Sequence, residues 1–104
     1  MEVLLIHRLI GVVPPEMMAA SIDIGKKLVV NPEEFVPGGK LIASYVARGL
    51  FLVVCIWEVP SMEALMPLEE QMNMLGWETD TIPVEKMGVA LPKFEKALQA
   101  MQAK

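Results

Sequence analysis

Residues 51–59 constrain the fold more than any other stretch, because they form an apolar run of β-branched and aromatic side chains that Pro60 ends. The length and composition of this run favour a β-strand over a helix. Both faces of the strand are apolar, with Phe51, Val53, Cys55 and Trp57 on one side and Leu52, Val54 and Ile56 on the other. Such a strand is typical of the middle of a sheet that is covered on both faces.

The apolar excess of the whole chain indicates self-association. The chain has 104 residues, enough for one hydrophobic core, so we expect a single domain over residues 1–104. Apolar residues make up about 60% when glycine is counted and tyrosine is not, against a usual value of about 45–50%. A small monomer has little interior in which to bury such an excess. We therefore expect a homodimer or a higher oligomer.

Charge, hydropathy and cysteine count exclude several classes of partner. No stretch reaches the roughly 18–20 apolar residues of a membrane-spanning helix, and the apolar run at 3–6 is too short for a signal peptide. The net charge of −4 argues against nucleic-acid binding. One cysteine permits no internal disulfide, which fits a reducing compartment. We predict a cytoplasmic protein with neither a membrane nor a nucleic acid as partner.

Periodicity and turn residues predict four strands and three main helical segments. The expected order is a strand at 3–10, a helix from 15 to 29, a helical turn at 31–34, strands at 41–47 and 51–59, a helix from 61 to 75, an edge strand at 77–84 and an amphipathic helix at 92–101. Pro67 should kink the helix at 61–75 or split it in two. The terminal helix carries Phe94, Ala97, Leu98 and Met101 on its expected inner face.

The two middle strands are expected to form a tight hairpin, because only Arg48 and Gly49 separate them. A two-residue loop would pair Ala47 with Leu50, Tyr45 with Leu52, Ala43 with Val54, and Ile42 with Cys55. A three-residue loop with a bulge would change this pairing.

The order β-α-β-β-α-β with a terminal helix is the ferredoxin-like α+β pattern, an antiparallel four-stranded sheet with its helices on one face. In that topology the first and third strands are central, which agrees with their being the most apolar. Pro83 falls in the last strand, an edge position where proline is tolerated. The uncovered face would lie open in a monomer, so we expect two sheets to pack face to face in a dimer.

A family resemblance appears in residues 49–84. The sequence Trp-Glu-Val-Pro-Ser-Met-Glu-Ala-Leu at 57–65 is followed by a Leu/Met-rich helix and a strand that ends in Pro83 and Val84. In this third of the chain the protein resembles the dimeric α+β barrel superfamily, in particular its muconolactone isomerase-like branch and related small bacterial proteins of unknown function. The resemblance implies a pocket beside the sheet, used for cofactor-free isomerisation or oxygenation of small lactones or aromatic compounds, or for binding alone.

Three residues are candidates for acid–base chemistry. His7 is the only histidine, and an imidazole titrates near neutral pH without tuning. Glu58 could orient His7 if their two strands ran parallel, and Tyr45 could donate to a developing oxyanion. Each has a structural alternative: His7 as a strand-end side chain bonded to backbone or solvent, Glu58 as a solvated group, and Tyr45 as a packing residue.

Trp57, Ser44 and Met66 are candidates for lining a pocket for a small apolar or aromatic ligand. We expect Cys55 to be an inert core residue, since no neighbour in the sequence would lower its pKa. The sequence contains neither metal-ligand spacing nor a phosphate-binding loop, so we expect no metal and no cofactor. The alternative function is a non-catalytic binding or assembly module. An unfilled cavity beside His7 would favour the enzyme, and a filled layer would favour the module.

Overall fold

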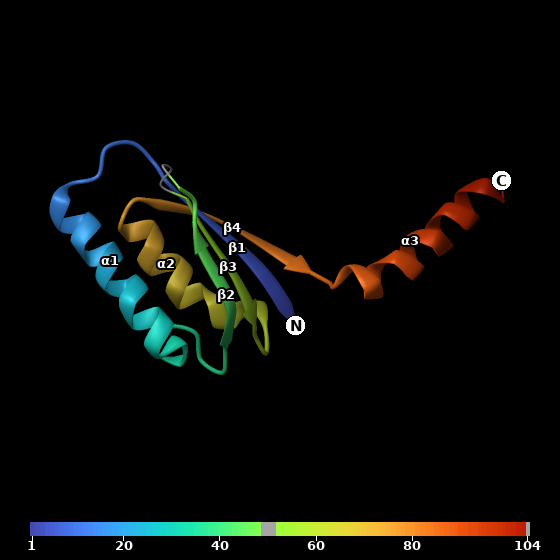
Figure 1. Cartoon of the computed structure of the whole chain (residues 1–104), viewed down its shortest axis with the longest axis horizontal. Coiled ribbons are helices and arrows are strands. Elements are labelled where there is room, and N and C mark those ends of the chain that lie inside the picture. Colours follow the sequence, from blue (N-terminus) through green and yellow to red (C-terminus); the bar gives the residue numbers. More distant parts are fainter. Residues whose placement is uncertain (49–51, 104) are drawn as a thin grey trace.

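The computed structural model describes residues 1–48 and 52–103. Along the chain, its elements are β1 (Glu2–Leu9), α1 (Pro15–Val30), the 3₁₀ helix η1 (Pro32–Glu34), β2 (Lys40–Val46), β3 (Leu52–Glu58), the 3₁₀ helix η2 (Met62–Leu65), α2 (Met66–Met74), β4 (Trp77–Val84) and α3 (Met87–Gln102) (Figure 1). The α+β class and the order of elements are confirmed. The predicted loop residue Gly49 and the predicted strand residues Leu50 and Phe51 lie outside the described residues.

The four strands form one antiparallel sheet in the order β2-β3-β1-β4. The two most apolar strands, β1 and β3, are central as predicted, and this order is compatible with the ferredoxin-like arrangement. Pro83 lies in the edge strand β4, where a missing backbone N–H on the outer side costs no ladder bond.

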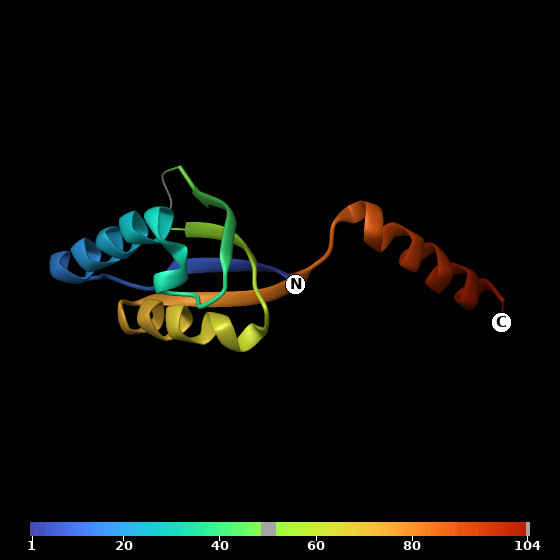
Figure 2. The same cartoon turned by 90° about the horizontal axis from the view of Figure 1, so that it is seen from below.

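Helices α1 and α2 lie on the same face of the sheet, as Figures 1 and 2 show together. The fully buried side chains of this layer come mainly from the central strands and from the segment around α2: Val3, Leu5, Cys55, Trp57, Leu65 and Leu68. One of the two alternating sets of apolar side chains predicted for the central strands lies on this face. The core therefore lies between the sheet and the helices.

Helix α1 turns a narrow apolar face towards the sheet. Pro15 occupies its first turn, where the missing N–H costs nothing, and Leu28 near its end is buried. Gly25 does not end the helix, which continues until the Asn31 N–H bonds the Lys27 carbonyl oxygen at 2.8 Å. The predicted helical spacing through Ile24 and Leu28 is confirmed, since these side chains pack in or against the core.

The pairing predicted for β2 and β3 is wrong. Tyr45 lies opposite Val54 instead of Leu52, and the Ala47 N–H donates to the Leu52 carbonyl oxygen, so the connection is longer than two residues. A register irregularity between Leu41 and Ala43 also removes Ile42 from its expected pairing. From Ala43 to Val46 the hydrophobic pattern could not reveal the error, because a shift of two residues leaves each side chain on its expected face.

Pro67 divides the helix predicted at 61–75 in two, which was one of the two predicted outcomes, the other being a kink. The 3₁₀ helix η2 precedes it, and Pro67 then lies in the first turn of α2. Gly76 follows α2 with a φ of 91°, a left-handed conformation that favours glycine and ends the helix.

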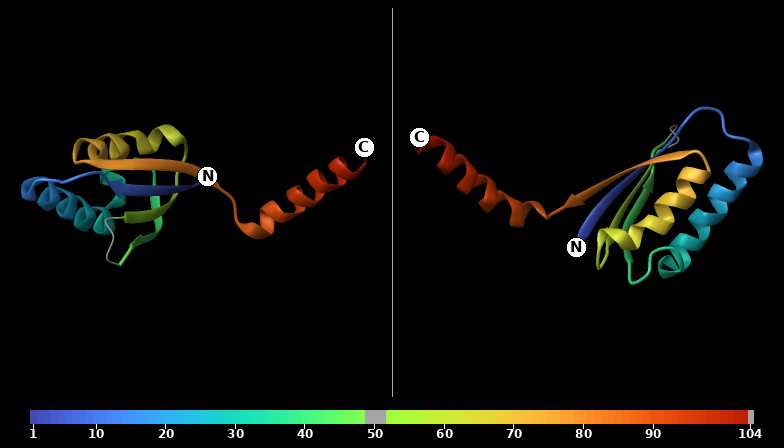
Figure 3. Two further views of the ribbon diagram at one scale, coloured as in Figure 1. Left: turned by 90° about the horizontal axis from the view of Figure 1, so that it is seen from above. Right: turned by 180° about the vertical axis from the view of Figure 1, so that it is seen from behind.

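Helix α3 departs most from expectation. It begins at Met87, contains Pro92 in its interior, and extends away from the rest of the chain (Figures 1 and 3). The molecule measures 58 × 30 × 22 Å as a result. The predicted inner face of Phe94, Ala97, Leu98 and Met101 is exposed, so the prediction that it packs inside the domain is wrong for a single chain. The two-residue connection after Val84 carries the helix away from the helical layer.

No described helix covers the second face of the sheet (Figures 1 and 2), and apolar side chains lie on this face. The register places Leu4 opposite Ile56 and Ile82, and Ile6 opposite Val54, on this open face. These residues are half-buried or exposed, while the alternate positions Val3, Leu5, Cys55 and Trp57 on the two central strands are fully buried. Among the described residues, no helix is long and apolar enough to cross a membrane.

Candidate functional site

Two adjoining cavities lie between α1 and the sheet. The outer cavity has a volume of about 460 Å³, and the inner one about 80 Å³. They share six lining residues: Ser21, Gly25, Leu28, Val53, Cys55 and Trp77. The cavities are therefore neighbouring parts of one site, which we call the α1–sheet pocket.

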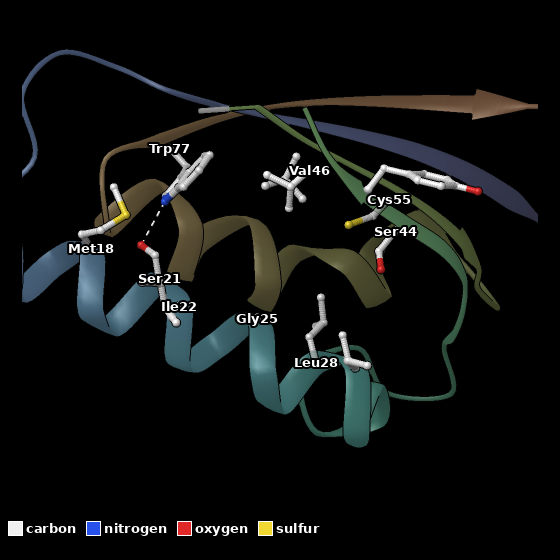
Figure 4. A pocket seen from close by; sticks show the side chains of 12 residues that line it. Met18, Ser21, Ile22, Gly25, Leu28, Ser44, Val46, Cys55 and Trp77 are labelled. Carbon is white, nitrogen blue, oxygen red and sulfur yellow. Dashed lines mark hydrogen bonds between the residues drawn. The ribbon is translucent and has the colours of Figure 1, made fainter. Parts of the chain in front are cut away.

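The walls of the outer cavity are almost wholly apolar. Ile22 of α1 lines it opposite Val46 of β2 (Figure 4). Val29 of α1 also lines it, and all three side chains are exposed, so we take them as its mouth. Gly25 leaves space in the middle of the α1 wall, since a Cβ built there would meet no atom within 4 Å. The outer cavity thus offers room and contact to an apolar molecule.

One hydrogen-bonded pair joins α1 to β4 across the site. The Trp77 Nε1–H donates to Ser21 Oγ at 2.9 Å, and the Ser21 hydroxyl donates to the Met17 carbonyl oxygen at 2.9 Å (Figure 4). Both polar groups are engaged within the protein, so they fix the wall in place. They do not need a ligand to satisfy them.

His7 lies in the inner cavity and is only 2% exposed. Its Nδ1 is 2.8 Å from Thr79 Oγ1, a hydrogen-bond distance, and Thr79 is its neighbour across the β1–β4 pair. Burial lowers the pKa of His7 to about 4, because the charged imidazolium would lose its hydration. The ring is therefore neutral at pH 7. The interpretation as a strand-end histidine bonded to backbone or solvent is wrong, since the hydroxyl of the half-buried Thr79 is its partner.

The structure does not bring Glu58 near His7. Strands β1 and β3 are antiparallel, so Glu58 lies opposite Glu2 while His7 lies opposite Val53. Five residues along a strand separate the two positions by about 17 Å. The Glu58 carboxylate instead accepts a hydrogen bond from the amino group of Met1 at 2.8 Å. The predicted pairing required parallel strands and is wrong for that reason.

The other predicted residues divide between the pocket and the rest of the molecule. Ser44 and Tyr45 line the outer cavity, with Tyr45 67% exposed, whereas His7 lines the inner one. Trp57 lines neither cavity: it is fully buried opposite Val3, and its Nε1 has no hydrogen-bond partner among the described residues. Met66 is half-exposed at the start of α2 and also lies outside the pocket.

Cys55 is buried as predicted, and it lines both cavities. Burial raises the pKa of its thiol to about 11, so the reactive thiolate is scarce at neutral pH. Within residues 1–48 and 52–103, no group of three or more His, Cys, Asp or Glu side chains could hold a metal ion. The site thus consists of apolar walls with one neutral imidazole at its inner end.

Sequence reasoning missed Ser21, Gly25, Thr79 and Trp77 as site residues. A signal was present in α1, where Ser21 and Gly25 are four residues apart on the same helical face as Leu28. Two small residues on a helix face that turns towards a sheet leave space where large side chains would fill it. Thr79 and Trp77 became recognisable only once the β1–β4 register was known.

Comparison with known proteins adds no family to these observations: no protein-family model matches the chain, and no curated protein is similar enough to be identified as a relative. The fold and the pocket together define an α+β protein with an apolar pocket between its sheet and its first helix.

Proposed function

We propose that the protein binds a small, uncharged apolar or aromatic molecule in the α1–sheet pocket. The observation that carries this proposal is the outer cavity of about 460 Å³ with almost wholly apolar walls. Binding sites for small molecules commonly occupy about 300–1,000 Å³ and combine apolar walls with a few polar groups. The inner cavity adds His7, which can make one directional hydrogen bond.

The neutral state of His7 supports an uncharged ligand. Among residues 1–48 and 52–103, no cationic side chain lines the pocket to pair with an anion. Burying an unpaired charge costs several kcal/mol or more. A phenol or a small lactone fits better, because its ring contacts the apolar walls and its one oxygen needs a single partner.

The catalytic form of the proposal is a cofactor-free isomerase or oxygenase acting on small lactones or aromatic compounds. His7 would act as the base, but a pKa of about 4 makes it a weak one. The sequence suggested His7 because an unperturbed histidine has a pKa near neutral pH. In the ligand-free protein His7 does not have such a pKa. Catalysis would need negative charge developing on the ligand beside the ring to stabilise the imidazolium. The geometry therefore supports binding more strongly than turnover.

The open sheet face supports a homodimer of the α+β barrel type. Apolar residues of two copies could cover one another there, with the sheets about 10 Å apart as in other face-to-face packings. A dimer would leave each pocket on the outer side of its own sheet, since the pocket and the open face are on opposite sides.

A panel of phenols and small lactones, screened by ligand-induced thermal shift, tests the binding proposal. We expect at least one member to raise the Tm of the unmodified protein. Gly25→Leu should abolish that shift by filling the pocket, whereas Ala19→Leu on the exposed side of α1 should retain it. Absence of any binder, or undiminished binding by Gly25→Leu, would overturn the proposal.

The second candidate is a non-catalytic assembly module, and the exposed apolar face of α3 favours it. In that case the protein would associate through its apolar surfaces with no small molecule in the pocket. Self-association without any binder in the same panel is the result that this alternative predicts.

A further inference from the structure

Helix α3 carries an apolar stripe that its own chain does not cover (Figure 3). The stripe has the alternating spacing of four and three residues that keeps side chains on one helical face, and its members are Met87, Leu91, Phe94, Leu98 and Met101. Each of them is close to half-exposed or more, and Phe94 is 66% exposed. We call this set the α3 stripe.

A second free helix of the same length would be a poor partner to cover the α3 stripe. α3 has 16 residues and is about 24 Å long, close to the limit at which isolated helices are marginal in water. Pro92 weakens it further by removing one helical hydrogen bond. The stripe spans about two heptads, while coiled coils are usually recognised over three or four. A folded body is therefore a better partner than a second free helix.

The body of its own chain is out of reach for α3 in the observed arrangement. Val84, the last residue of β4, lies opposite Glu2, whereas the pocket lies at the other end of the sheet, near Val53. Strand β4 is also the edge opposite β2, which forms the pocket mouth. Helix α2 packs beside β4, where Thr81 Oγ1–H donates to Glu69 Oε1 at 2.6 Å. A path back across the helical layer would have to pass over α2.

The connection to α3 is short and braced. Only Glu85 and Lys86 separate β4 from α3, and two residues span at most about 7 Å. Lys93 forms an ion pair with Glu85, and the Val89 and Ala90 N–H groups both donate to the Lys86 carbonyl oxygen. These contacts hold the first turn of α3 together, directly after the short connection.

Charge favours a second copy of this chain as the partner of α3. Residues 86–104 contain four lysines and one glutamate, a net charge of +3, while residues 1–85 contain five basic and twelve acidic residues, a net charge of −7. The projecting helix of one copy is thus attracted to the body of another.

We propose that α3 of one copy packs across the mouth of the α1–sheet pocket of a second copy, so that each pocket is completed by its partner. The mouth residues Ile22, Val29 and Val46 are exposed and apolar, as the α3 stripe is. One contact would cover both unpartnered surfaces. The inference rests on the pocket of the proposed function, but it concerns what closes that pocket.

Cross-linking between differently tagged chains tests this arrangement. Chains with Ile22→Cys at the mouth are mixed with chains with Leu98→Cys on the stripe and treated with a short bismaleimide. We expect a mixed product at several times the yield given by Glu70→Cys on the outer side of α2, paired with the same Leu98→Cys chain. The unmodified protein serves as the control for Cys55, which is buried. Equal yields for the two pairs would overturn the proposal.

Cys55 also reports on closure, because it lines the pocket. Phe94→Glu should increase the rate at which Cys55 is alkylated at least several-fold, since it would displace α3 from the mouth. Gln99→Glu, an exposed change of equal charge off the stripe, should leave the rate unchanged. Equal rates in both variants would contradict the closure. Ligand binding without cross-linking would leave the pocket assignment intact, and cross-linking without ligand binding would leave the α3 contact intact.

Discussion

At the scale of single residues, the environment of His7 determines what the site can do. The sequence marks this histidine as a titrating group, but the fold buries it beside Thr79 and lowers its pKa to about 4. A neutral ring with one occupied nitrogen suits hydrogen bonding to an uncharged ligand. Its role as a base then depends on what the ligand contributes.

The buried neutral His7 predicts a loss of stability in mild acid. The pKa of a histidine is 6.5 when unperturbed and about 4 in the folded protein, so between these values the unfolded state binds more protons. Stability from this group is therefore complete above about pH 6.5 and falls as the pH is lowered towards 4, by about 3 kcal/mol in all.

Denaturant unfolding at several pH values between 7 and 4 measures this loss directly. His7→Gln should remove most of the pH dependence in that window, whatever its effect on stability at pH 7. An equal slope in the variant and the unmodified protein would show that other groups cause it.

At the scale of elements, the sequence predicted the order and type of strands and helices because apolar periodicity reports burial directly. It did not predict the β2–β3 register, since pairings two residues apart place Tyr45 on the same face. It began the last helix at Pro92 because proline is common in a first turn, whereas α3 begins at Met87 and tolerates the proline in its exposed interior.

The site was less predictable than the fold for a related reason. Its lining residues come from α1, β2, β3 and β4, and only the register brings Thr79 beside His7. The sequence identified His7, Ser44 and Tyr45 from residue type alone, and it could not separate them from Glu58 or Trp57 without knowing strand directions.

Gly25 provides a prediction for α1. It lies in the helix interior, and a Cβ there would meet no atom within 4 Å. Gly25→Ala should therefore stabilise the protein by about 1 kcal/mol, through the higher helical propensity of alanine. Thermal and denaturant unfolding would measure the change, and Ala19→Gly on the exposed side should give a loss of similar size. A destabilised Gly25→Ala protein would mean that α1 lies closer to the sheet than the structure shows.

At the scale of the whole molecule, two apolar surfaces besides the pocket mouth remain uncovered among the described residues: the open sheet face and the α3 stripe. The sequence predicted the first from the double-faced apolar strands β1 and β3. It did not predict the second, because an amphipathic helix gives the same pattern whether it packs on its own domain or on another copy. Both surfaces support the proposal that the functional unit contains more than one chain.

Sedimentation equilibrium at micromolar concentration tests this central claim most directly. We expect the unmodified protein to sediment as a dimer or larger assembly. Val54→Lys combined with Ile56→Lys should lower the sedimenting mass to that of an assembly held by the α3 contact alone, because these changes put charge on the open face and leave the helical layer and α3 intact. Glu78→Lys, an exposed change on the edge strand of the same face, serves as the control and should preserve the assembly. A stable monomer of the unmodified protein would contradict the account.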